Sequence, residues 1–421
     1  MLDIKLIRDN PEIVREAMKK RGERASLDPI AKLDEQRRKL LHEMETYRAH
    51  RNEVSKQLGK MADKPPKLIA EMRQLGEKVT SLEAEISNLE SELNDILLRL
   101  PNIPAPDVPV GKDTQDNIVV RSWGKPKDTS FTPLPHWELA EKLNIIDFQR
   151  GVKLSGSRFY VLRGQGARLQ RALITFMLDL HVKEHGYTEI YPPFMVKREC
   201  MVGSGNLPKF ADNLYHDEED DFWFVPTAEV PLTNLHRDEV LPPGTLPLYY
   251  VAYTACFRRE KMAAGKDTRG IKRGHQFDKV ELYKFTEPEK SDKELEKLVS
   301  NAEDVSRRLG IPYRVVQLCT GDLGFASAKS FDIEMWAPGS GEWLEVSSCS
   351  NCSDFQARRA NIRYRADAKA KPSFVHTLNG SGLALPRVVI ALIENYQQAD
   401  GSIKVPEALI SFMGTEIINK V

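Results

Sequence analysis

The sequence has few cysteines, no long apolar run and no excess of charge of either sign. Five cysteines among 421 residues are an odd and sparse set, which indicates reduced thiols in a cytoplasmic protein. No stretch approaches the roughly 18 apolar residues that a membrane span requires. The first ten residues carry charges throughout and lack the apolar core of a secretory signal. We therefore expect a cytoplasmic protein with no membrane partner.

Because the chain has no net charge, its composition gives no indication of a charged binding partner. The 61 basic residues balance 61 acidic ones, so overall charge predicts no nucleic-acid partner. Cys349 and Cys352 have the spacing of half a zinc site, but no second pair accompanies them, and structural thiols are the favoured interpretation. The length allows two or three domains with a sizeable core. Function must therefore be sought in local patterns.

The most regular pattern is a pair of heptad seams in the first hundred residues. Apolar residues advance in alternating steps of three and four along 30–61 and again along 68–100, interrupted only by Arg37 and Arg51. Pro65-Pro66 lies between the two runs. Adjacent seams joined by a short turn predict an antiparallel α-helical coiled-coil hairpin. Helices of about 35 residues would make it roughly 50 Å long.

Charge is distributed unevenly along this hairpin. Residues 48–78 carry eight lysines or arginines against four acidic residues, whereas 79–100 carry five acidic residues against Arg99 alone. An ordinary solvated coiled-coil surface would explain this, and so would a basic tip that binds an RNA backbone by neutralising phosphates. The candidate RNA contacts are Arg48, Arg51, Lys56 and Lys60. Arg51 also lies on the seam and could instead cross-brace the hairpin.

A stiff proline-rich linker at 101–109 separates the hairpin from a region of alternating strands and helices. Strand patterns occupy 249–257, 278–285, 314–318, 330–336 and 343–347, and helix patterns occupy 170–184, 290–309 and 387–398. Consecutive strands leave little room for crossover connections. The second part is therefore predicted to be an α+β domain, a largely antiparallel sheet flanked by helices.

Three local signatures follow one another in this second part. Gly186–Met195 is a strand after a long helix, and Phe257-Arg258-Arg259-Glu260 ends a strand before a loop rich in Gly, Lys and Arg. Gly380–Arg387 enters a helix with Arg387 at its start. A guanidinium grips phosphate oxygens in a fixed, permanently charged fork, so Arg258 and Arg387 suit a phosphate site. In isolation, either arginine would be interpreted as a surface charge.

This set resembles the class II aminoacyl-tRNA synthetases and, among them, the bacterial-type seryl-tRNA synthetases. Further matches occur in the family's order along the whole chain: Ile103-Pro104, Thr227-Ala228-Glu229, His275–Glu281, Glu345–Ser348, Asn379–Gly382 and the helix around Glu394-Asn395-Tyr396-Gln397. The resemblance implies that the protein activates L-serine with ATP and transfers the seryl group to serine tRNA, with selenocysteine tRNA as a further substrate. It also implies a homodimer.

The resemblance further implies a domain organisation and a set of site residues. Residues 1–104 would be a tRNA-binding domain containing the hairpin at about 28–100, and 105–421 the class II catalytic domain. Arg258 and Arg387 would be catalytic, because positive charge at the phosphates is the main requirement of adenylate formation. For ATP the implied residues are Arg258, Arg259, Glu260, Phe277, Glu345, Val346, Ser347, Ser348 and Arg387. For serine they are Thr227, Ala228, Glu229, Arg258, Glu281 and Ser381; for tRNA, Arg48, Arg51, Lys56 and Lys60; and for the cofactor Mg²⁺, Glu345 and Ser348.

Some of these assignments raise physical questions. Strict strand alternation places Glu345 and Ser348 on opposite faces, so joint coordination of a metal requires the strand to end or bulge at Ser347-Ser348. Glu281 lies in an apolar strand: either it is buried and needs a partner, which bound serine could supply, or it faces water at a sheet edge. Gly274 replaces a residue that is usually bulkier in the family, and we expect it to loosen packing near the nucleotide.

Two rival functions follow from the same patterns. A class II ligase for another amino acid is opposed by the hairpin and by Thr227-Ala228-Glu229. A catalytically inactive RNA-binding relative is opposed by the presence of Arg258, Glu345 and Arg387. Pro386, where a small residue is common, fits the first turn of the predicted helix.

Overall fold

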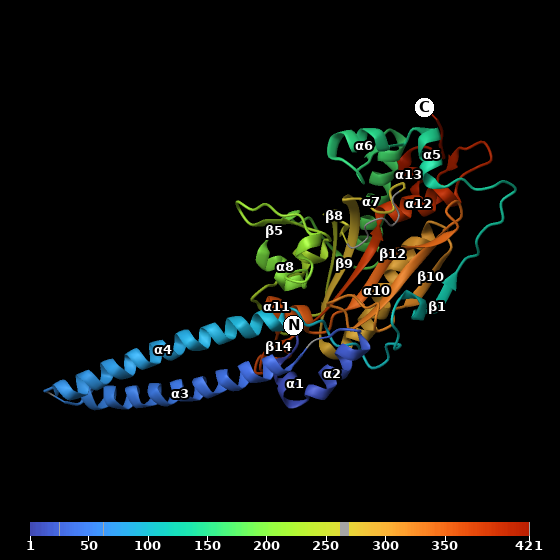
Figure 1. Cartoon of the computed structure of the whole chain (residues 1–421). Coiled ribbons are helices and arrows are strands. Elements are labelled where there is room, and N and C mark those ends of the chain that lie inside the picture. Colours follow the sequence, from blue (N-terminus) through green and yellow to red (C-terminus); the bar gives the residue numbers. More distant parts are fainter. Residues whose placement is uncertain (25, 62, 262–268, 421) are drawn as a thin grey trace. The chain divides into compact units, whose positions relative to one another are not determined.

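The computed structural model describes residues 1–24, 26–61, 63–261 and 269–420, and the chain divides into two compact units (Figure 1). One unit comprises 2–19 and 23–100; the other comprises the chain from 101 onward together with residues 1 and 20–22. The loop predicted to be rich in Gly, Lys and Arg lies largely outside the described residues. Among the residues described, no helix has the length and apolarity to cross a membrane.

The first unit is built on two long helices. Its helices are α1 (Ile4–Asp9), α2 (Pro11–Lys20), α3 (Asp28–Gly59) and α4 (Pro66–Leu97). The predicted hairpin is confirmed, since α3 packs along α4 with Met44, Val79, Leu82 and Ile86 in a shared apolar cluster. The predicted seam residues are buried or half-buried, except Met61, which follows the end of α3 and is exposed. The heptad spacing of apolar residues was therefore enough to identify the buried face of α3 and α4.

The second unit contains an eight-stranded sheet in the order β1-β10-β11-β12-β15-β9-β8-β4. The strands are β1 (Ile118–Trp123), β4 (Thr188–Ile190), β8 (Leu248–Phe257), β9 (Gln276–Thr286), β10 (Tyr313–Gln317), β11 (Lys329–Ala337), β12 (Glu342–Asn351) and β15 (His376–Ala384). Neighbouring strands are antiparallel, except that β4 pairs with β8 in parallel. The predicted strands all occur, and the α+β prediction is confirmed.

Three helices pack against one face of this sheet: α7 (Gln165–Lys183), α10 (Ser291–Arg308) and α12 (Leu385–Asn395). Strand alternation in β9 shows how the sequence separates the two faces. Val280 and Leu282 are fully buried in the core formed with these helices. Lys279 and Glu281, on the opposite face, line a cavity.

Shorter elements surround the sheet. The remaining helices are α5 (His136–Leu143), α6 (Phe148–Ser155), α8 (Arg198–Ser204), α9 (Glu229–Asn234), α11 (Phe355–Ala360), α13 (Ile410–Met413) and the 3₁₀ turns Thr114–Asp116, Ala211–Asn213, Pro288–Lys290 and Glu407–Leu409. The remaining strands are β2 (Ile146–Asp147), β3 (Val161–Leu162), β5 (Met195–Lys197), β6 (Phe222–Phe224), β7 (Val240–Leu241), β13 (Arg363–Tyr364), β14 (Ser373–Phe374), β16 (Ile403–Lys404) and β17 (Ile417–Ile418).

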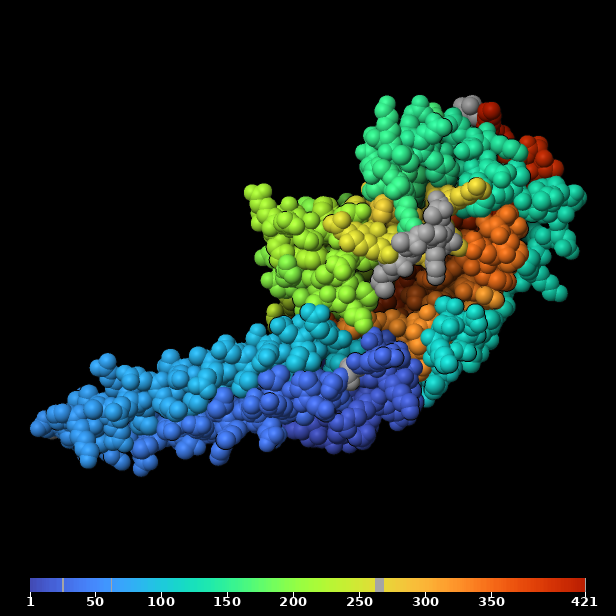
Figure 2. Space-filling view, in the orientation of Figure 1, coloured from blue at the N-terminus to red at the C-terminus, as the bar shows by residue number. Residues whose placement is uncertain are grey.

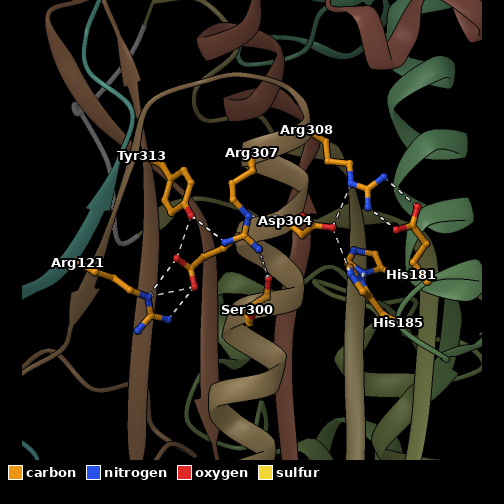
Figure 3. A network of polar contacts seen from close by, with 10 residues as sticks. Arg121, His181, His185, Ser300, Asp304, Arg307, Arg308 and Tyr313 are labelled. Carbon is orange, nitrogen blue, oxygen red and sulfur yellow. Dashed lines mark hydrogen bonds and ion pairs between the residues drawn. The ribbon is translucent and has the colours of Figure 1, made fainter.

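Polar contacts fix α10 to the sheet edge and to the end of α7 (Figure 3). Arg121 of β1 donates to Glu303 of α10 at 2.7 Å, and the Tyr313 hydroxyl of β10 donates to the same carboxylate at 3.0 Å. On the other side of α10, Asp304 lies 3.4 Å from the Nε2 atom of His185. These contacts tie α10 to β1 and β10 on one side and to the segment after α7 on the other.

Candidate active site

A cavity of about 650 Å³ opens on the sheet face opposite α7, α10 and α12. Its walls come from β9, β12 and β15, from the segments that connect β8 to β9, and from the starts of α9 and α12. Figure 2 shows the second unit hollowed between the yellow and orange segments. The volume falls within the range of small-molecule sites.

Most residues expected from the sequence meet at this cavity. Those that line it are Thr227, Glu229, Arg258, Glu260, Phe277, Glu281, Glu345, Val346, Ser348, Ser381 and Arg387. They come from five separate segments of the sequence, 227–229, 258–260, 277–281, 345–348 and 381–387, and both arginines expected to be catalytic are among them. The fold therefore brings the separate signatures together around one space.

Three expected site residues do not line the cavity. Ala228 is buried in a core cluster. Arg259 turns away: its guanidinium lies 4.4 Å from the Tyr215 ring centroid and its Nε donates to the Leu214 carbonyl at 2.8 Å. Ser347 is buried, and its hydroxyl donates to the Ser381 carbonyl at 2.6 Å, which ties β12 to β15. The side chains of Ala228, Arg259 and Ser347 are therefore directed away from the cavity, and they contact other parts of the protein.

One end of the cavity contains a buried carboxylate that already has partners. The Lys279 ammonium lies 2.5 Å from Glu281 Oε2, and the Thr227 hydroxyl donates to the same oxygen at 3.1 Å. The Glu281 side chain is only 2% exposed, and β9 lies between β15 and β8 inside the sheet. The alternative of an edge-strand glutamate facing water is therefore wrong, and the partner of Glu281 in the free protein is Lys279.

A second carboxylate, Glu229, lies at the same end. Its Oε1 accepts hydrogen bonds from Gln356 Nε2 at 2.6 Å and from Asn379 Nδ2 at 2.9 Å. Burial, together with the nearby charge of Glu281, raises the pKa of Glu229 to about 7. Two carboxylates in one buried pocket favour binding of an ammonium group.

The two arginines are fixed by main-chain carbonyls. Arg258 Nε donates to the Pro226 carbonyl at 3.2 Å, and its guanidinium lies 5.0 Å from the Phe277 ring centroid. Arg387 Nη1 donates to the Glu345 carbonyl at 2.7 Å and lies 3.1 Å from Glu345 Oε2. Each guanidinium keeps further N–H groups, so both can be held in place and still bind phosphate oxygens.

The expected metal ligands share one face because β12 contains a bulge. Glu334 of β11 pairs with Glu345 and Ile333 pairs with Ser347, which leaves Val346 as an extra residue. The bulge lies one residue before the predicted position, and the strand continues to Asn351. Beyond the bulge, Ser348 pairs with Asp332, two residues from Glu334. Glu345 and Ser348 therefore lie on the same side of the sheet.

The oxygen donors at this place fit Mg²⁺. Asp332 Oδ1 is buried without a hydrogen-bond partner. Burial raises the pKa of Asp332 well above its usual range, and the charge of Glu345 adds to the effect. Within the described ranges, no group of three His, Cys, Asp or Glu side chains could hold a metal. A hard cation held by few protein oxygens and completed by phosphates and waters suits such a site.

The cavity wall around Glu260 and Gly274 is closely packed. Glu260 Oε2 lies 3.5 Å from the guanidinium of Arg273. A Cβ at Gly274 would lie 3.0 Å from the Gln276 carbonyl and 3.3 Å from the Tyr160 ring. Neighbouring protein atoms thus lie close to the position that a larger side chain would take, and the looser packing of Gly274 against the nucleotide stays a prediction. Pro386 lies in the first turn of α12, as predicted.

Several cavity residues were not predicted. Lys279 and Asn379 line the cavity two residues before Glu281 and Ser381, so strand alternation could have indicated both. Gln356, which holds Glu229, comes from α11 and has no comparable indication in the sequence.

The basic part of the hairpin has mixed surroundings. Arg48 of α3 is paired across the hairpin with Glu83 of α4 at 2.6 Å. Lys56 and Lys60 are exposed, whereas Arg51 is half-buried on the seam. Arg48 is exposed as well, but its guanidinium is already engaged with Glu83, so Lys56 and Lys60 are the favoured RNA contacts among the four expected residues.

Comparison with known proteins agrees along the whole chain. The family model "tRNA synthetase class II core domain (G, H, P, S and T)" matches residues 210–396, and "Seryl-tRNA synthetase N-terminal domain" matches residues 1–104. A serine–tRNA ligase of Thermomicrobium roseum is 62% identical over 98% of this chain and 94% of its own length. One from Dehalococcoides mccartyi is 63% identical over 99% of this chain and all of its own. The solved seryl-tRNA synthetase of Pyrococcus horikoshii, complexed with ATP, is 42% identical, with a TM-score of 0.92 and full coverage of both chains.

Proposed function

The chain belongs to the seryl-tRNA synthetase family of class II aminoacyl-tRNA synthetases, and we propose that the cavity is where it joins serine to ATP. Its activity is serine–tRNA ligation. The serine carboxylate attacks the α-phosphorus of ATP, diphosphate leaves, and the resulting seryl-adenylate passes its seryl group to serine tRNA with release of AMP. The single observation that carries the site proposal is that Arg258 and Arg387, from different elements, line one cavity together with Glu229 and Glu281.

The acidic end of the cavity binds serine in this proposal. The ammonium group lies among Glu229, Glu281 and the Thr227 hydroxyl, and Ser381 closes the pocket. A pocket that hydrogen-bonds the serine hydroxyl rejects alanine by roughly four orders of magnitude, because its polar groups would be left unpaired. Threonine is excluded by the lack of room for a methyl group.

The arginines perform the charge stabilisation. Adenylate formation needs no protein nucleophile, because in-line positioning and positive charge at the phosphates lower the barrier. Arg258 would bind the α-phosphate and Arg387 the γ-phosphate, with Phe277 stacked on adenine and Glu260 accepting its amino group. Glu345 and Ser348 would hold Mg²⁺, which supplies further positive charge to the phosphates. Ala228, Arg259, Val346 and Ser347 would support the site mainly through the backbone and packing.

The rest of the proposal concerns partners and organisation. Residues 1–104 would form the tRNA-binding domain and 105–421 the catalytic domain, a division supported by the family-model match to 1–104. A homodimer is supported by the edge strand β4 and by the apolar side chains that follow it, since Tyr191 is 79% and Met195 49% exposed. Selenocysteine tRNA as a second substrate and a cytoplasmic location rest on the family resemblance, and the sparse cysteines support the latter.

Pyrophosphate exchange with each of the twenty amino acids tests the proposal. The full chain and a form with residues 48–78 shortened would be compared. We expect serine-dependent exchange in both and loss of tRNA charging only in the shortened form. Exchange driven by another amino acid would reject the serine pocket. Charging that survives the shortening would reject tRNA binding by the hairpin tip.

A further inference from the structure

A buried histidine outside the cavity links two of its walls. His136, the first residue of α5, is 2% exposed. Its Nδ1 lies 3.2 Å from Glu394 Oε1, and its Nε2 lies 3.2 Å from the backbone nitrogen of Ile271. Neither His136 nor Glu394 lines the cavity. The pair belongs to none of the groups that would touch a substrate.

The hydrogen-bond partners fix the tautomer of this histidine. The Ile271 N–H can only donate, so Nε2 must present its lone pair. The ring proton is then on Nδ1, where it donates to the Glu394 carboxylate. Glu394 is itself immobilised, because it accepts from the His136 backbone N–H at 2.9 Å and from the Ser340 N–H and hydroxyl at 2.9 and 2.8 Å.

The residue held by His136 begins the segment that returns to β9. Ile271 is 1% exposed, and the next three residues, Lys272–Gly274, all line the cavity. Lys272 is paired with Glu342 at 2.6 Å, and Arg273 with Glu260 at 3.5 Å. The backbone position of Ile271 therefore decides where two cationic side chains enter the nucleotide end of the cavity.

Glu394, which orients His136, lies on α12, the helix that also carries the cavity residue Arg387. Arg387 and Glu394 are seven residues apart, about two helical turns, so they lie on the same side of this helix. The helix that presents Arg387 to the cavity thus also presents the carboxylate that orients His136.

The backbone is shaped to fit the ring. Gly270 has a φ of +72°, and a Cβ built there would lie 1.8 Å from His136 Nε2. Only glycine both adopts this conformation readily and leaves the imidazole room to reach Ile271.

We propose that His136 is a positioning residue that, oriented by Glu394, holds Ile271 so that Lys272 and Arg273 face the nucleotide. The proposal rests on the proposed function, since it assumes that ATP occupies this end of the cavity. It assigns His136 no contact with substrate and no proton transfer.

Two substitutions separate the two hydrogen bonds of the ring. In His136→Asn the amide N–H can replace Nδ1–H toward Glu394, but no acceptor reaches Ile271. In His136→Gln the amide oxygen can replace Nε2 as acceptor, but the donor to Glu394 is lost. We expect His136→Asn to raise KM for ATP in serine-dependent pyrophosphate exchange about tenfold, as loss of a buried hydrogen bond would. His136→Gln should stay within about threefold of the unsubstituted chain, and KM for serine should change in neither.

Melting temperatures distinguish positioning from simple support of the fold. A purely structural role predicts that both variants raise KM for ATP in proportion to their loss of Tm, and that result would overturn the proposal, as would an unchanged KM in His136→Asn. If His136→Asn does not fold, Gly270→Ala displaces the ring from the other side and should raise KM for ATP alike. A full chain without serine-dependent exchange would contradict the proposed function instead, and direct titration with ATP and Mg²⁺ would then still test the His136 contact.

Discussion

The Nδ1 atoms of His181 and His185 lie 3.0 Å apart at the end of α7, on the helix-covered side of the sheet (Figure 3). His181 is fully buried, and its Nε2 donates to the Gly382 carbonyl at 3.2 Å, directly after the cavity residue Ser381. Burial lowers the pKa of His181 to about 3, and the neighbouring His185 adds to this effect. Burial also lowers the pKa of His185, although Asp304 opposes the change. The pair is therefore neutral at physiological pH.

Acid should destabilise the second unit, from residue 101 onward, through His181. In the unfolded chain this histidine takes up a proton near pH 6.5, whereas in the folded state its pKa is about 3. The unfolded state binds the extra proton, so the stabilising contribution is complete above pH 6.5 and is lost as pH falls toward 3. We expect the free energy of unfolding by urea to fall between pH 7 and 5 with a slope approaching about 1.4 kcal/mol per pH unit from this group. His181→Gln should reduce the slope, whereas His42→Gln, on the exposed surface of α3, should not.

Serine binding should strengthen as pH rises through neutrality. The pKa of Glu229 is about 7 in the free protein, because burial and Glu281 disfavour its charge. The serine ammonium favours the carboxylate form, so binding must release the proton when pH is below 7. We expect KM for serine in pyrophosphate exchange to fall several-fold between pH 6 and 8, approaching tenfold per pH unit at the acid end. KM for ATP is the internal control. In Glu229→Gln, KM for serine should be higher and independent of pH, and an unchanged profile would assign the titration to another group.

Removing Lys279 alone should destabilise the protein more than removing the charges of Lys279 and Glu281 together. Removing the ammonium in Lys279→Met leaves the Glu281 carboxylate buried and takes away its ion-pair partner, while the Thr227 hydroxyl still donates to it. We expect a loss of about 3–5 kcal/mol in the free energy of unfolding, because an uncompensated buried charge remains. Lys279→Met combined with Glu281→Gln should recover much of that loss without restoring serine-dependent exchange. Additive effects in the double-mutant cycle would show that the two groups do not interact.

Regular patterns were predictable from the sequence, and local irregularities were not. The seam from Ile30 to Leu58 follows from period alone, since each apolar residue has one way to be buried in a two-helix hairpin. The shared face of Glu345 and Ser348 depends on a bulge at Val346, and the sequence does not mark which residue is extra. Gln356 and His136 act on residues more than a hundred positions away, so only the tertiary fold reveals their roles.

Lys56 and Lys60 should contribute to tRNA binding more directly than Arg48. Both lysines are exposed, whereas Arg48 is engaged with Glu83 at 2.6 Å. Lys56→Glu and Lys60→Glu should each raise KM for serine tRNA in charging assays and leave serine-dependent pyrophosphate exchange unchanged. The dependence of log K on log salt should decrease by about 0.7–0.9 for each phosphate contact that is lost. Lys39→Glu, exposed on the same helix outside residues 48–78, is the matched control.

The charge swap Arg48→Glu with Glu83→Arg separates bracing from RNA contact. Arg48→Glu alone removes the cross-hairpin ion pair and places two like charges together, so it should weaken charging through either role. The double substitution allows an ion pair to form again across α3 and α4, while moving the positive charge to the neighbouring helix. If Arg48 mainly braces the hairpin, the double variant should charge tRNA nearly as well as the unsubstituted chain. Charging that stays low in the double variant, with an unchanged melting temperature, would show that the guanidinium itself must reach the RNA from α3.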